Sequence, residues 1–174
     1  MARISLKVGD ILEIPLSLGR KAYGQYIFLD KEMGPLFQVY DLITENVVRL
    51  DQLKEAKALF PPIIVGLKAA VRLGLWTVVG RMPVEGFVYP NFVSTFFNFK
   101  TGKAGIWFLW DGNQSIRIGN KLPEEYKKLE FLSVWSPYDV VERIETVNCL
   151  FPNCLFPYRE LILNNEFTPR VKRS

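Results

Sequence analysis

Apolar and polar side chains alternate along the first third of the chain, which is the pattern of strands with one buried face. In the run 9–16 the leucine and isoleucine side chains at even positions share one face, while Glu13 and Pro15 take the other. Because Pro15 has no N–H to donate to a sheet ladder, this strand is expected to lie at a sheet edge or to end there. Two further runs, 22–29 and 36–40, each follow a turn, so the pattern predicts a small, strongly curved antiparallel meander.

Later segments predict more short strands and one or two short helices. The strands are expected at 63–67, 73–80, 93–99, 106–110 and 115–118, with a hairpin loop at 100–105. One short helix is expected over 51–58, with Asp51 as its N-cap. A second is expected over 136–145, where Ser136 is a suitable N-cap and Pro137 takes the first helical position. The fold class predicted is therefore α+β: a strand-dominated single domain with a curved antiparallel sheet or partial barrel.

The chain of 174 residues is long enough to bury about 70% of its unfolded surface, so it needs no disulfide or metal to fold. It contains no internal repeat and no linker of glycine and serine, and we expect one domain over residues 1–169. Residues 170–174 carry three of the basic charges and are expected to form a disordered basic tail. Without them the balance is 19 basic to 18 acidic residues, which does not indicate a nucleic-acid groove.

The absence of histidine excludes several kinds of active site. Neither a Ser-His-Asp or Cys-His catalytic set nor a mixed Cys/His zinc site can be built from this sequence. It has no phosphate-binding loop and no nucleophile elbow. Glu142 and Glu145 are one helical turn apart, but a hydrated polar face explains them better than catalysis, and Asp10 is expected to be a turn residue. We therefore expect a protein that is not an enzyme and that needs no cofactor or metal.

Two cysteines and the N-terminus bear on the compartment. Cys149 and Cys154 have four residues between them, so they form neither a redox CxxC pair nor a four-ligand zinc set. The N-terminus has no apolar signal region, and the longest uncharged stretch, 86–99, is too short to span a membrane. These features predict a cytoplasmic protein without a membrane segment and with both thiols free and buried.

Aromatic residues gather in one part of the chain. Nine of the 24 lie between Phe87 and Trp110, and both faces of the run 106–110 are apolar. A strand buried on both faces explains this pattern. The alternative is an exposed face with anchors for a protein partner, for which Trp107, Trp110 and the following turn residue Asp111 are the candidates. A stacking platform for single-stranded nucleic acid is less favoured, because few basic residues lie among these aromatics.

Two blocks of the sequence resemble the immunity protein 26 family. The first is Gly9-Asp10-Ile11…Ile14-Pro15-Leu16 followed by Ala22-Tyr23-Gly24-Gln25, and the second is Leu75-Trp76-Thr77-Val78-Val79-Gly80-Arg81-Met82-Pro83. The resemblance covers about residues 7–100 and assigns no catalytic residue. The glycines suit tight turns or close backbone approach, while Tyr23 and Trp76 suit core positions.

The resemblance implies a non-enzymatic bacterial immunity protein, encoded beside a polymorphic toxin, that neutralises its cognate toxin by direct protein–protein binding. Inhibitors of basic nucleases are expected to be acidic, since complementary charge steers association. This chain is not acidic, so either the toxin is not a basic nuclease or a local acidic patch makes the contact. The alternative function is a nucleic-acid-binding module that uses the basic C-terminal tail as an arm.

Overall fold

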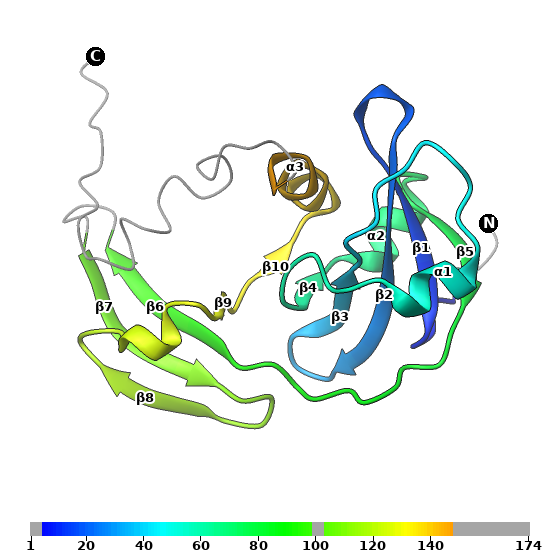
Figure 1. Cartoon of the computed structure of the whole chain (residues 1–174). Coiled ribbons are helices and arrows are strands. Elements are labelled where there is room, and N and C mark those ends of the chain that lie inside the picture. Colours follow the sequence, from blue (N-terminus) through cyan, green and yellow to red (C-terminus); the bar gives the residue numbers. More distant parts are fainter. Residues whose placement is uncertain (1–4, 99–102, 148–174) are drawn as a thin grey trace, which may run out of the picture. The chain divides into compact units, whose positions relative to one another are not determined.

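A computed structural model describes residues 5–98 and 103–147, which form two sheets (Figure 1). One sheet lies in unit 1, residues 5–88 and 133–147, and the other in unit 2, residues 89–98 and 103–132. The expected single domain over 1–169 stays a prediction. The basic tail at 170–174 and both cysteines lie outside the described residues.

Unit 1 contains a six-stranded sheet with the order β10-β4-β3-β2-β1-β5. All neighbours are antiparallel except β10 and β4. The bounds are β1 (Asp10–Pro15), β2 (Lys21–Asp30), β3 (Gly34–Val39), β4 (Ile63–Val65), β5 (Thr77–Arg81) and β10 (Val134–Trp135). The predicted meander is confirmed as β1-β2-β3. Strand β1 lies between two neighbours and is therefore not an edge strand. It ends at Pro15, which was the other expectation for this proline.

Strand β1 is buried on both faces and not on one, because helices cover each side of the sheet. Leu12 and Ile14 belong to a large apolar cluster to which α2 (Leu67–Arg72) and α3 (Pro137–Val147) contribute. Ile11 belongs to a second cluster that includes Leu53 of α1 (Leu50–Glu55). In the first cluster, the rings of Phe37 and Trp76 stack with their centroids 5.4 Å apart. Burying side chains of this size contributes about 1.5–3 kcal/mol each to stability.

Two helix predictions need correction. Helix α1 has Arg49 as its N-cap, not Asp51, because the Gln52 side chain accepts a hydrogen bond from the Arg49 N–H at 2.9 Å and fixes an earlier start. Helix α2 was not expected: the apolar run 63–67 supplies only three strand residues before the helix starts at Leu67. Strand β5 accordingly starts four residues later than the predicted strand.

Helix α3 begins as predicted, with the Ser136 hydroxyl accepting a hydrogen bond from the Asp139 N–H at 3.2 Å. Near its other end, Glu145 accepts a 2.6 Å hydrogen bond from the N–H of Ser17. Ser17 begins the short 3-10 helix η1 (Ser17–Gly19) between β1 and β2. One carboxylate thus ties α3 to the meander across 128 residues of sequence.

The Glu145 contact predicts a pH-dependent stability. Hydrogen bonds from Ser17 lower the pKa of the Glu145 carboxyl, and the charge of Arg20 adds to the effect. Because the pKa is lower in the folded state, the carboxylate stabilises the fold above its unfolded pKa, and this contribution is lost as the pH falls through the folded pKa. We expect Glu145→Gln to lower the free energy of unfolding by about 1 kcal/mol at neutral pH. The difference from wild type should shrink below about pH 4 in urea titrations, and a difference that persists there would contradict the assignment.

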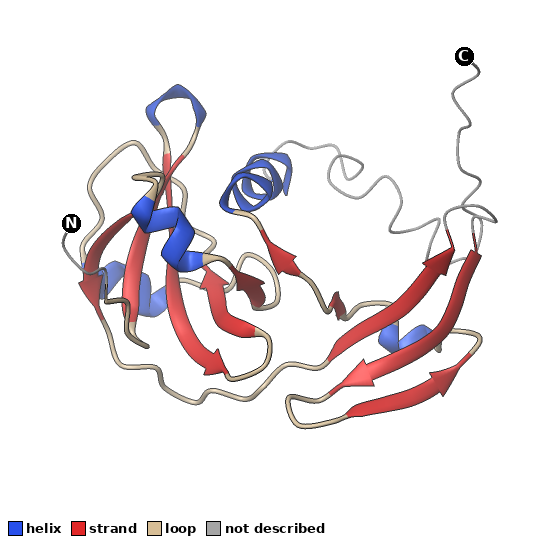
Figure 2. Cartoon of the chain, turned by 180° about the vertical axis from the view of Figure 1, so that it is seen from behind, coloured by secondary structure: helices blue, strands red, loops and turns tan. Residues whose placement is uncertain are grey.

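Unit 2 contains a four-stranded sheet with the order β8-β7-β6-β9. Its strands are β6 (Phe92–Asn98), β7 (Lys103–Trp110), β8 (Ser115–Gly119) and β9 (Glu130–Phe131), and its helical part is the 3-10 turn η2 (Glu124–Tyr126) (Figure 2). Val93, Trp107 and Leu109 of the sheet pack with Leu122 and with residues around η2. The strand-dominated α+β class is confirmed, and the described strands form two sheets and no closed barrel.

Candidate partner-binding surface

The sheet of unit 2 has a second face, opposite its apolar cluster, that we call the aromatic face. It is defined by Ser94 and Phe96 of β6, Phe108 of β7, and Ser115 and Arg117 of β8. Ser94 pairs across the strands with Phe108, and Phe108 pairs with Arg117, which places these side chains on one side of the sheet. The pair Thr95–Trp107 belongs to the covered side.

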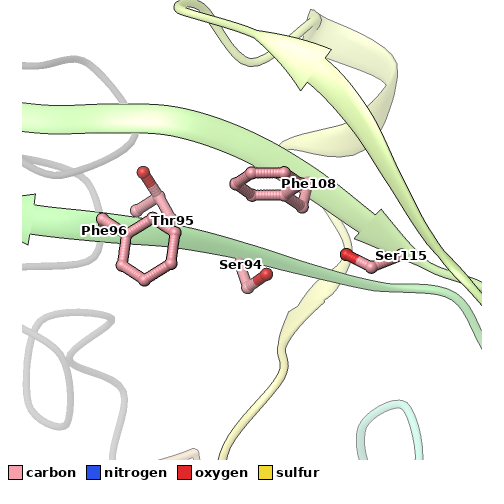
Figure 3. Close-up of a pocket in the computed structure, with 5 residues that line it drawn as sticks. All are labelled: Ser94, Thr95, Phe96, Phe108 and Ser115. Carbon is pink, nitrogen blue, oxygen red and sulfur yellow. The ribbon is translucent and has the colours of Figure 1, made fainter.

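Two phenylalanines dominate the aromatic face, and a shallow hollow of about 240 Å³ lies beside them (Figure 3). Phe96 is 77% exposed. Its ring meets that of Phe108 edge to face, with centroids 6.0 Å apart and planes at 87°, a favoured geometry for two aromatic rings. The hollow is lined by Ser94, Thr95, Phe96, Phe108 and Ser115. An exposed aromatic ring packed on a half-buried one, with hydroxyl groups around them, is typical of a protein-contact surface.

The backbone is irregular at the exposed Phe96. The register between β6 and β7 shifts between Thr95 and Phe97, so Phe96 lies at a β-bulge, opposite Gly105 and Ile106 of β7. An added Cβ on Gly105 would lie 2.9 Å from the Phe96 carbonyl oxygen. Glycine therefore permits the close approach of the two strands at the bulge.

The structure separates the three residues predicted to bind a partner. Trp107 is fully buried in the apolar cluster on the covered side, and its indole N–H has no hydrogen-bond partner among the described residues. Trp110 is on the aromatic face, at the end of β7, where it pairs with Ser115. It is 8% exposed, and its indole N–H donates to the Tyr89 hydroxyl at 3.1 Å. Trp110 and Asp111 therefore border the aromatic face. Partner binding by the three residues stays a prediction.

Asp111 organises the turn between β7 and β8. One carboxylate oxygen accepts hydrogen bonds from the N–H groups of Asn113 and Gln114, each at 2.8 Å. The N–H groups of Gln114 and Asn113 lower the pKa of the Asp111 carboxyl, so it carries its charge at neutral pH. The turn expected from the sequence at this position is confirmed.

A second candidate site lies in unit 1, where the two sequence blocks noted above meet. The Gln25 side chain is buried, and its amide nitrogen donates to the Met82 carbonyl at 2.9 Å and more weakly to that of Pro83 at 3.4 Å. Its amide oxygen accepts a hydrogen bond from the Tyr40 hydroxyl at 2.9 Å. The Met82 N–H donates to the Gly9 carbonyl at 2.9 Å. Gly9 has a φ of +97°, and an added Cβ would lie 2.6 Å from the Met82 carbonyl oxygen.

An ion pair between a buried carboxylate and an exposed arginine lies beside this cluster. Asp10 accepts hydrogen bonds from Arg81 at 2.8 Å (Nε) and 2.7 Å (Nη2), and from the N–H of Lys7 at 2.7 Å. The aspartate thus joins β1 to β5, beyond the turn role expected from sequence. The polar side chains in this part of unit 1 have partners within the protein, so the arrangement holds strands together and resembles no catalytic set.

Comparison with known families identifies this scaffold. The family described as Immunity protein 26 matches residues 7–102, more than half of the chain. The chain belongs to the immunity protein 26 family. No curated protein and no solved structure matches it. Membership confirms the resemblance seen in the sequence and supports a role in toxin immunity.

The family match covers the two candidate sites unequally. The second candidate site, around Gln25 and Asp10, lies wholly within residues 7–102. Of the aromatic face, β6 lies inside this range, whereas β7 and β8 lie beyond its end.

Among the described helices, none has both the length and the apolar character needed to cross a membrane. Nowhere in residues 5–98 and 103–147 do three potential ligands from His, Cys, Asp or Glu gather as for a metal ion.

Sequence reasoning missed Phe96, Phe108 and Arg117 as surface residues. The aromatic run 106–110 predicted a strand buried on both faces, and the bulge at Phe96 has no local sequence signal. The sequence did hold a signal for this surface in Ser94, Ser115 and Arg117. Polar residues at alternate positions of neighbouring strands indicate a sheet face in contact with water.

Proposed function

We propose that this immunity protein neutralises a cognate bacterial toxin by direct protein–protein binding, without chemistry of its own. The family match over residues 7–102 carries the proposal. The exposed Phe96 and the half-buried Phe108 of unit 2 support it, because aromatic side chains dominate the binding energy of protein interfaces. We propose that the protein acts in the bacterial cytoplasm by covering the surface through which the toxin reaches its target.

The test is co-expression with the toxin domain encoded beside this protein. We expect a host that expresses the toxin domain alone to stop growing, and a host that also expresses the immunity protein to grow. A toxin domain with an inactivated catalytic centre should form a stoichiometric complex with the immunity protein, measured by light scattering. Growth without a detectable complex would refute neutralisation by binding. A complex without protection would show that binding does not cover the functional surface.

We also propose that Trp110 and Asp111 contribute to the contact, with Trp107 supporting the strand from the covered side. Trp110→Ala is expected to cost at least about 2 kcal/mol of binding free energy, measured by calorimetry at a temperature where the variant is folded. Tyr89→Phe is the matched control, because it removes the hydrogen bond to Trp110 and leaves the indole in place. Unchanged affinity together with a large drop in melting temperature would show that Trp110 serves the core alone.

A further inference from the structure

We infer that the aromatic face binds an acidic patch of the toxin, in which a carboxylate lies beside an apolar side chain. This inference rests on the proposed function and names the surface and the chemistry of the partner. Its two parts are an apolar anchor at Phe96 and Phe108 and a cation at Arg117.

The apolar part is suited to a side chain of a protein. The hollow beside Phe96 measures about 240 Å³, below the roughly 300–1,000 Å³ of small-molecule sites. Its lining offers two phenyl rings, and hydroxyl groups from Ser94 and Ser115. This lining can take one apolar side chain and satisfy a few polar groups around it, and it has no charged group to fix a cofactor.

The cationic part lies on β8, the strand next to Phe108. Arg117 is exposed and is the cross-strand partner of Phe108, so their Cβ atoms are about 4.5–5.5 Å apart. The structure shows no ion pair between Arg117 and another described residue. Its neighbours on the aromatic face, Phe108 and Ser115, bring no negative charge. An arginine in this position can bind a carboxylate with two parallel hydrogen bonds.

The charge at the aromatic face favours the same partner. The described residues of unit 1, 5–88 and 133–147, include eleven basic and twelve acidic residues. Those of unit 2, 89–98 and 103–132, include five basic and four acidic residues, and Arg117 is the basic residue on the aromatic face. Complementary charge raises association rates and disfavours partners of like charge. Arg117 therefore suits a carboxylate of the partner and disfavours a basic surface such as that of a nuclease.

The experiment measures the affinity of the full chain for the inactivated toxin domain after two substitutions. Phe96→Ala removes the apolar anchor and Arg117→Glu reverses the charge. Each is expected to weaken binding at least about thirtyfold, as for an interface hot spot. Arg117→Glu should also slow association, and the association rate of wild type should fall with added salt. Both altered residues are exposed, so the melting temperature should change little.

Two matched controls accompany these variants. Tyr138→Ala removes an exposed aromatic ring of unit 1, and Lys128→Glu makes the same type of charge reversal within unit 2, next to η2, which packs on the covered side of the sheet. Both should stay within about threefold of the wild-type affinity, the range of near-neutral interface and surface changes. Replacing the toxin's carboxylate residue that contacts Arg117 with lysine should restore binding to the Arg117→Glu variant.

The outcomes separate this inference from the proposed function. If wild type binds and protects while Phe96→Ala and Arg117→Glu bind as tightly as the controls, the aromatic face is not the contact and the proposed function stands. If wild type neither binds the toxin domain nor protects, the proposed function fails and this inference fails with it. Binding of single-stranded DNA that is lost in Arg117→Glu, without toxin binding, would overturn the protein partner in favour of nucleic acid.

Discussion

Replacing Arg81 with methionine is expected to lower the free energy of unfolding by about 3 kcal/mol, the lower end of the range for breaking a buried ion pair. The two partners are buried to different extents: the Asp10 side chain is 4% exposed and that of Arg81 is 52% exposed. Removing the arginine leaves a buried carboxylate that still accepts a hydrogen bond from the Lys7 N–H. Methionine keeps much of the apolar stem, so the loss reports on the charge.

The controls for this prediction use both partners. Arg49→Met breaks the exposed pair between Arg49 and Asp51 and should cost at most about 1 kcal/mol. Asp10→Asn should cost less than Arg81→Met, because the remaining guanidinium can be hydrated. Urea unfolding followed by circular dichroism measures all three variants. Equal losses for Arg81→Met and Arg49→Met would show that water reaches Asp10 in the folded protein.

The ion pair shows which part of the fold the sequence could not reveal. Alternation of side chains predicts β1 and β2 correctly, because each strand's pattern is local. Asp10 and Arg81 are separated by 71 residues, and nothing near either one indicates the other. The same holds for Gln25, whose amide bonds to a carbonyl 57 residues away. The sequence places these residues in two motif blocks, and only the fold shows that the blocks meet.

Apolar runs are the other source of error, since they do not distinguish a strand from a short helix. The run 63–67 was predicted to be one strand, yet α2 starts at Leu67 and buries that residue and Ala70 in the core. A helix of six residues is held by such packing, because its own propensity is too weak. On β7 the same ambiguity concealed the aromatic face: apolar residues on both sides of the run 106–110 predicted burial, whereas Phe108 is half-buried beside the exposed Phe96 of β6.

Replacing Trp76 with alanine is expected to cost about 3–5 kcal/mol of unfolding free energy, as for other large aromatic residues removed from a core. Trp76 is 2% exposed and stacks on Phe37 within the main apolar cluster of unit 1. Its removal leaves a cavity that the surrounding strands can close only in part. Val79→Ala is the control, because Val79 follows in the same motif block with an exposed side chain, and it should cost at most about 0.5 kcal/mol.

The Trp76 variant also distinguishes the scaffold from the contact surface. If the family motif serves the core and the aromatic face makes the contact, Trp76→Ala should lower the midpoint in urea yet bind the inactivated toxin domain with wild-type affinity at a temperature where it is folded. Phe96→Ala should show the opposite behaviour. Loss of affinity in a folded Trp76→Ala protein would place the contact on unit 1, and a loss of stability below about 1 kcal/mol would show that Trp76 is not a core residue. Wild-type affinity in a folded Trp76→Ala protein would show that this motif residue serves the scaffold and that the contact is made by residues elsewhere.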